Sequence, residues 1–252
     1  MLKRVLFIIV LIAFILIVSI LWIDKFGNLF STFQLFRATR WVFLVTFIIG
    51  TIAGIIGAII KITLRSRKTN RQLDRHSIDS IMEHWGTAVG IFILMVSGFQ
   101  LRYHGGLPAI KLHFLGLFLT LLFGTYFLAD FFVSKKYKAL LPSIKDIIEG
   151  TIKKYLLRLK SKETGKYLSS QKSSFLIFVI LGTFIFISGV IKLLFFYMAL
   201  PFRLLEIATK VHDISALLFA LVLAVHVLLV IARRGNWPLL WSWFNGKTPE
   251  GH

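Results

Sequence analysis

Residues 208–232 read ATKVHDISALLFALVLAVHVLLVIA, an apolar run long enough to cross a hydrocarbon core of about 30 Å as one helix. The whole chain of 252 residues is 57% hydrophobic and has a mean hydropathy of +0.80, well above that of soluble domains. Further apolar runs of spanning length occur at 5–23, 41–64, 80–100, 113–133 and 173–198. The pattern predicts an all-α, polytopic membrane protein with six spans.

The basic residues predict the orientation of these spans and explain the formal net charge of +19. Six spans place four segments on one side of the membrane, and these carry most of the 30 Lys and Arg residues: 1–4, 65–79, 134–172 and 233–252. By the positive-inside rule this side is the cytoplasm, so we expect both termini on the cytoplasmic side of the inner membrane. No folded nucleic-acid-binding module is visible, and we expect no nucleic acid as a partner.

The chain divides into an N-terminal part, 1–79, with two spans and a basic loop, and a four-span part, 80–252. The first span follows Lys3 and Arg4 as a signal peptide would, but its length and the lack of a small-residue cleavage site predict a retained anchor. In the second span, three glycines predict close packing against another helix: Gly50, Gly54 and Gly57. Two lysines near helix ends, Lys61 and Lys192, are expected to extend towards the membrane surface.

Within the long basic loop, residues of about 142–160 predict an amphipathic helix. Its apolar positions recur every three or four residues at Ile144, Ile148, Ile152, Tyr155 and Leu159. Such a helix fits the inner leaflet of the membrane, with lipid on its apolar face. A soluble helix packed against a partner protein is the alternative.

The redox chemistry open to this chain depends on histidine, because it contains no cysteine and 7 histidines. The lack of cysteine excludes cysteine-ligated iron–sulfur clusters and thioether-attached haem. Four histidines lie in the apolar runs: His84, His113, His212 and His226. Ionisable side chains inside a membrane are costly and usually functional. His76, His104 and His252 are expected to be solvated surface residues.

The four membrane histidines form two pairs when the chain is followed through the bilayer. His84 begins a span that starts inside, whereas His113 begins one that starts outside. The last span also starts outside, so His212 lies at the depth of His113, and His226, about 21 Å further along, at the depth of His84. Paired imidazoles are what a six-coordinate haem iron needs, whereas zinc would need three or four ligands together. The pattern therefore predicts two haem b groups, with the iron bound by His113/His212 and by His84/His226.

Other residues near these depths are compatible with haem. Gly98 follows His84 by fourteen residues on the same face, so we expect the outer macrocycle to pass over it. Gly116 and Gly124 offer similar room, or simply helix packing. Asp213 is a weak candidate for orienting His212. Cations for the haem propionates are available outside at Arg102, Lys111, Arg203 and Lys210, and inside at Arg75, Arg233 and Arg234.

The arrangement of one histidine in each of two helices and a fourteen-residue pair in the last resembles the membrane cytochrome b subunits of respiratory formate dehydrogenases. Relatives serve nickel–iron hydrogenases and thiosulfate reductases. The resemblance covers about 80–252 and includes two short segments, Leu141-Pro142-Ser143 and Gly165 to Lys172. It implies electron transfer from an iron–sulfur subunit and a catalytic subunit to a quinone, either menaquinone or ubiquinone. The first two spans have no counterpart in this family and look like an added hairpin that docks a partner or lipid.

In the family, the second segment helps to form a quinone site beside the inner haem. This chain keeps Tyr167 and Gln171 but has Leu168 where an asparagine is usual. Asp130 is a candidate for proton supply to a quinone, or a plain interfacial residue. The chain has no motif for oxidising a substrate of its own. Two alternatives stay open: a subunit whose histidines bind chlorophyll magnesium, and a transporter with histidine proton relays.

Overall fold

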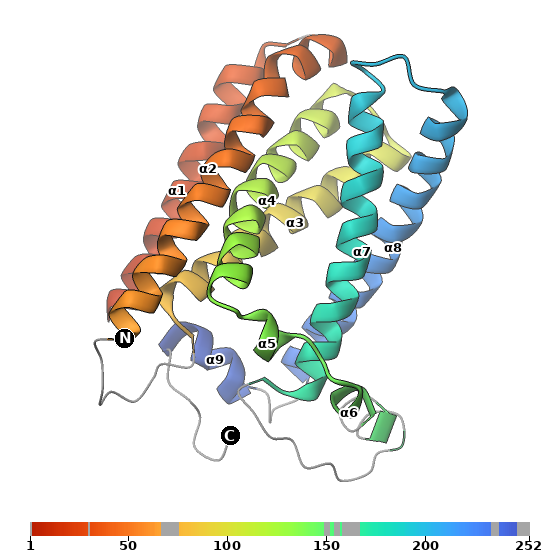
Figure 1. Ribbon diagram of the computed structural model, residues 1–252. Helices are drawn as coiled ribbons and strands as arrows, with labels where there is room; N and C mark the ends of the chain where they lie inside the picture. Colours follow the sequence, from red (N-terminus) through yellow and green to blue (C-terminus); the bar gives the residue numbers. More distant parts are fainter. Residues whose placement is uncertain are drawn as a thin grey trace. The chain divides into compact units, whose positions relative to one another are not determined.

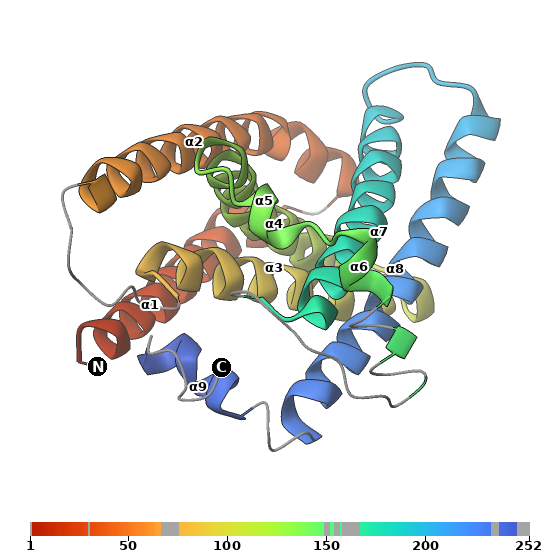
Figure 2. The ribbon, with the colours of Figure 1, turned by 60° about the horizontal axis from the view of Figure 1, so that its bottom comes forward.

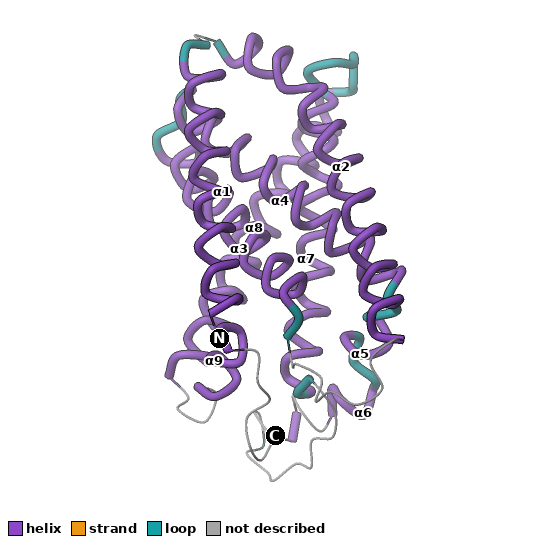
Figure 3. The backbone as a smooth tube through the Cα atoms, turned by 90° about the vertical axis from the view of Figure 1, so that its left-hand side faces the viewer, coloured by secondary structure: helices purple, strands orange, loops and turns teal. Residues whose placement is uncertain are grey.

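Helices make up the folded part of the chain. The computed structural model describes residues 2–29, 31–66, 76–148, 152–153, 157, 167–232 and 237–245. Figure 3 shows helices and loops, and no strand, among these residues. Six helices are long and apolar enough to cross a membrane, so the predicted all-α protein with six spans is confirmed.

The chain forms two compact units, which we describe separately. Unit 1 comprises residues 1–136 and 238–252, and unit 2 comprises residues 137–237. The helices of unit 1 are α1 (Leu2–Gly27), α2 (Thr32–Ser66), α3 (Ile78–Tyr103), α4 (Leu107–Val133) and most of α9 (Trp237–Asn245). Unit 2 contains α5 (Tyr137–Leu140), α6 (Ile144–Asp146), α7 (Ser169–Leu194) and α8 (Phe202–Ala232).

Helix α4 is the centre of unit 1, with α2 on one side and α3 on the other (Figure 2). Small residues bring the backbones close together. A Cβ atom at Gly54 of α2 would overlap the backbone of Tyr126 in α4, and one at Gly116 of α4 would lie 2.9 Å from the backbone nitrogen of Leu94 in α3. The close packing predicted for the glycines of the second span is thus confirmed, and Gly116 is a packing residue.

Aromatic side chains attach α1 to the same core. The indole nitrogen of Trp22 donates a hydrogen bond of 3.2 Å to the Lys111 carbonyl, and its ring lies 5.7 Å from that of Phe118. Many other apolar side chains of α1 are exposed, for example Ile20 at 64% and Ile23 at 64%. This exposure suits a helix whose outer face meets lipid rather than water.

Helices α3 and α4 form a hairpin with a short turn at residues 104–106. Gly105 and Gly106 have φ angles of 64° and 95°, a conformation that glycine adopts without steric cost. Pro108 follows in the first turn of α4, where its missing N–H is no loss. Helix α4 therefore begins at Leu107, and the expectation that His113 begins the fourth helix was wrong by nearly two turns.

In unit 2, α7 and α8 form an antiparallel hairpin (Figure 1). The rings of Phe178 and Phe219 lie 5.0 Å apart across it. The fifth span was expected at 173–198 but is Ser169–Leu194, because the polar residues 169–174 continue the helix and the chain turns before Pro201.

The predicted amphipathic helix of about 142–160 begins as expected at Ser143, which forms a capping box with Asp146. Regular α-helix extends only to Asp146, and residues 147–148 and 152–153 have the wider winding of a π-helix. Ile144 is 79% exposed and Ile148 42%, which leaves an apolar face uncovered within this segment. Tyr155 and Leu159 lie outside the described residues.

Candidate haem-ligating histidines

His113 is held at a ring nitrogen by a serine of the neighbouring helix. Ser97 of α3 is fully buried, and its Oγ lies 3.0 Å from Nδ1 of His113. The same hydroxyl donates a 2.6 Å hydrogen bond to the Ile93 carbonyl on its own helix. A hydroxyl has one proton, so towards His113 it accepts from Nδ1–H. This tautomer leaves Nε2 as the nitrogen with a lone pair for a metal.

His212 has the same arrangement in unit 2. Ser188 of α7 is buried, donates a 2.6 Å hydrogen bond to the Phe184 carbonyl and lies 3.2 Å from Nδ1 of His212. The Ile185 carbonyl lies 3.1 Å from the same nitrogen and can only accept a proton. Nδ1 therefore carries the hydrogen, and Nε2 is again the nitrogen suited to iron. Asp213 is exposed, so Ser188 and Ile185 take the orienting role considered for it.

A glycine adjoins each of these histidines. A Cβ atom at Gly98 would lie 3.9 Å from Cε1 of His113, and one at Gly189 would lie 3.3 Å from Cε1 of His212. Gly98 was predicted from the sequence as a residue beside the outer haem, whereas Gly189 was missed. A comparison of the segments Val96-Ser97-Gly98 and Ile187-Ser188-Gly189 would have found it. Gly124 faces open space within unit 1.

His84, in α3, lies against aromatic rings. Its ring lies 4.4 Å from that of Trp243 in α9, with an angle of 20° between the planes, and 5.4 Å from that of Trp85. His76 stacks on Trp243 as well, at 3.7 Å and 15°. His76 is only 5% exposed, so the expectation that it is a solvated surface residue was wrong. The distance of more than 150 residues between His76 and Trp243 hides this contact from the sequence.

His226, in α8, is half-buried beside Phe178, and the centroids of the two rings lie 5.8 Å apart in an edge-to-face arrangement. His104 is exposed as expected, and His252 lies outside the described residues. Among the candidate propionate cations, Lys111 donates a 2.6 Å hydrogen bond to the Gly27 carbonyl and Lys210 pairs with Glu206 at 2.7 Å. Three others, Arg75, Arg233 and Arg234, lie outside the described residues.

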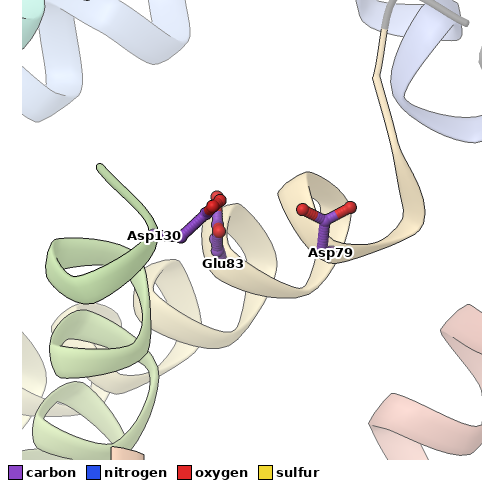
Figure 4. Close-up of side chains that lie close together, drawn as sticks. All are labelled: Asp79, Glu83 and Asp130. Carbon is purple, nitrogen blue, oxygen red and sulfur yellow. The ribbon is translucent and has the colours of Figure 1, made fainter. Parts of the chain in front are cut away.

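A buried group of charged residues, which we name the charged cluster, lies at the end of unit 1 where α3 begins. It comprises Lys61, Asp79, Glu83, Asp130 and Lys136. Asp130 has a side chain that is 1% exposed, and its carboxylate lies 2.6 Å from the Lys61 ammonium and 2.5 Å from that of Lys136. Glu83 points towards Asp130 from α3, with Asp79 one turn earlier on the same helix (Figure 4).

The charged cluster gives Lys61 and Asp130 partners that the sequence did not predict. Lys61 pairs with Asp79 and Asp130, so it joins α2 to α3 and α4. Asp130 is buried between two lysines near the C-terminal end of α4. The cluster holds three carboxylates and two ammonium groups, so each ammonium is shared between two carboxylates. Burial alone would lower the pKa of Lys136, but the attraction of Glu83 and Asp130 raises it, so this lysine stays charged.

The residues proposed for quinone binding lie at the start of α7 in unit 2. The Gln171 side chain accepts a 3.0 Å hydrogen bond from the backbone N–H of Leu168, at the N-cap of the helix. Tyr167 is half-buried and directly precedes the cap. Next to Gln171 in the sequence, Lys172 of α7 pairs with Asp146 of α6 at 3.1 Å. Hydrogen bonds from Ser143 and the charge of Lys172 hold the pKa of Asp146 below its usual range.

Six membrane-spanning helices with four histidines inside them define a multi-pass membrane protein suited to a haem. The model of the family described as prokaryotic cytochrome b561 matches residues 75–241, about two thirds of the chain. The chain belongs to this family, and it is a membrane cytochrome b that binds haem b and transfers electrons. The first two helices precede the matched residues. Comparisons with curated proteins and with solved structures found no match.

Proposed function

We propose that the chain holds two haem b groups, one with His113 and His212 as iron ligands and one with His84 and His226. The observation that carries this proposal is the spacing of fourteen residues between His212 and His226 in α8, together with the positions of His84 and His113 near opposite ends of the α3–α4 hairpin. Fourteen residues rise about 21 Å along a helix and return to nearly the same face.

The surroundings of these histidines support haem rather than another cofactor. Ser97 and Ser188 hold Nδ1 of His113 and His212, which directs Nε2 towards a metal. Gly98 and Gly189 place no side chain beside the two rings. A bound haem supplies one-electron redox chemistry, and the protein determines its potential through the axial ligands and their hydrogen bonds.

In the proposed complex, electrons come from an iron–sulfur subunit that serves a catalytic subunit such as a formate dehydrogenase. They enter at His113/His212 on the outer side of the cytoplasmic membrane and leave near His84/His226 to menaquinone or ubiquinone. Tyr167 and Gln171 are proposed to border the quinone site. The side of the membrane follows from the excess of basic residues in the segments that include both termini.

Single ligand replacements test the two-haem proposal. His226→Leu is expected to remove one haem and leave the other, and His212→Leu to remove the other one, because each histidine serves a different iron. Haem content and reduced-minus-oxidised spectra of the purified full-length protein measure the result. His104→Leu, at an exposed histidine, is the control and should retain both haems. Loss of both haems from each single variant, with the protein still folded, would contradict the pairing.

A further inference from the structure

The two helical hairpins hold one histidine each in the same way. In α3–α4, Ser97 and Gly98 lie against His113, and in α7–α8, Ser188 and Gly189 lie against His212. Both serines are buried, at 0% and 2% exposure. Both donate a 2.6 Å hydrogen bond to the carbonyl four residues earlier, which directs an oxygen lone pair at the histidine Nδ1. Aromatic rings lie beside His84 and His226.

This repeated arrangement has a chemical consequence for any iron bound at Nε2. An acceptor at Nδ1–H gives the imidazole partial imidazolate character and makes it a stronger donor. A stronger donor stabilises ferric over ferrous iron, which lowers the midpoint potential. Two such acceptors act together if both histidines bind the same iron.

We propose that Ser97 and Ser188 are a matched pair of positioning residues that fix the tautomer of the two ligands of one haem and lower its midpoint potential. The inference rests on the proposed pairing of His113 with His212. It assigns a lowered potential to the haem whose two ligands each have a serine acceptor.

The two serines should differ in the size of their effect. Nδ1 of His212 has a second acceptor, the Ile185 carbonyl at 3.1 Å, which remains when Ser188 is replaced. Ser97→Ala is therefore expected to raise the midpoint potential of one haem more than Ser188→Ala does. Both variants should shift the same haem, and the double variant should shift it by about the sum.

Redox titration of the purified full-length protein, followed at each haem band, tests the proposal. Ser97→Thr keeps the hydroxyl and should restore the wild-type potential. Ser19→Ala is the matched control, because Ser19 makes the same hydrogen bond to a carbonyl four residues earlier, at 2.8 Å from Ile15, in α1. It should leave both potentials unchanged. The low-spin ferric electron paramagnetic resonance signal gives a second readout of the altered ligand.

The outcomes separate this inference from the proposed function. Two haems with unchanged potentials in both alanine variants would overturn the serine proposal and leave the two-haem proposal intact. Shifts of two different haems would overturn the matched pair, because the serines would then serve separate irons. A wild-type protein with a single haem would contradict the proposed function itself. If Ser97→Ala does not accumulate, Ser188→Ala carries the test, since His212 keeps the Ile185 acceptor.

Discussion

The two ends of the α3–α4 hairpin hold their histidines by different means. At one end, His113 donates a hydrogen bond from Nδ1 to a buried serine, and a glycine adjoins it. At the other end, His84 has the indole of Trp243 stacked on its ring face and the charged cluster on its helix. The first arrangement fixes a nitrogen and its proton, whereas the second fixes the plane of the ring.

The difference extends to where the contacts come from along the chain. Ser97, Gly98 and His113 all belong to one hairpin, so their arrangement needs little beyond α3 and α4. His84 depends on α9 through Trp243, and the charged cluster near it depends on α2 through Lys61. Helix α2 is therefore connected to the histidine-bearing helices α3 and α4 by ion pairs as well as by close helix packing.

Replacement of Asp130 should have the largest effect on this comparison. Asp130→Asn leaves two buried ammonium groups without their shared carboxylate, which we expect to lower the free energy of unfolding by about 3 kcal/mol. The value is at the low end for a buried ion pair because both lysine side chains are partly exposed, at 27% and 18%. Denaturant titration of the purified protein in detergent measures it. Glu206→Gln, at an exposed pair with Lys210, is the control and should change stability by less than about 1 kcal/mol. Equal effects of the two variants would show that the charged cluster contributes no more than a surface ion pair.

Removal of the stacked indole comes next in size. Trp243→Ala loses two stacked contacts, with His84 and His76, each worth about 0.5–1.5 kcal/mol. We expect a loss of about 1–3 kcal/mol in stability and an altered spectrum of the haem proposed for His84, with the haem proposed for His113 unchanged. Trp241→Ala, on the same helix but 60% exposed, is the matched control. A change at both haems would contradict the separation between the two ends.

A substitution at Gly98 should have the smallest effect on stability. It should change one of the two proposed haems and not the other. A Cβ atom at position 98 would lie 3.9 Å from Cε1 of His113, so a leucine there would place its larger side chain beside the histidine ring. Gly98→Leu is expected to displace the haem proposed for His113, or to shift its potential, and to spare the second proposed haem, with little change in the free energy of unfolding. Gly182→Leu, where the Cβ atom would face Phe219 at 4.0 Å, is the control in the other hairpin. Unchanged potentials in Gly98→Leu would make Gly98 a packing residue only.

The sequence predicted the six membrane-spanning helices well, because the length of an apolar run decides whether a helix can cross the membrane. All six spans were expected, and their ends were displaced by up to nine residues because helices continue past the hydrocarbon core into polar segments such as 169–174. The glycines of α2 were expected to allow close packing, and they do. Their partner helix was not predicted, because periodicity within one helix carries no information about its neighbour.

The sequence by itself determined the six spans, their predicted orientation and the four membrane histidines, because burial of apolar side chains in a bilayer depends on composition along single helices. Tertiary structure alone decided that Ser97 and Ser188 hold His113 and His212 at Nδ1, that Trp243 stacks on His84 and His76, and that Lys61 pairs with Asp130. These contacts join residues from 16 to more than 160 positions apart. Hydrogen bonds and ion pairs act over a few ångströms, so they depend on which helices pack together, and packing follows the shapes of both surfaces rather than the pattern of either one.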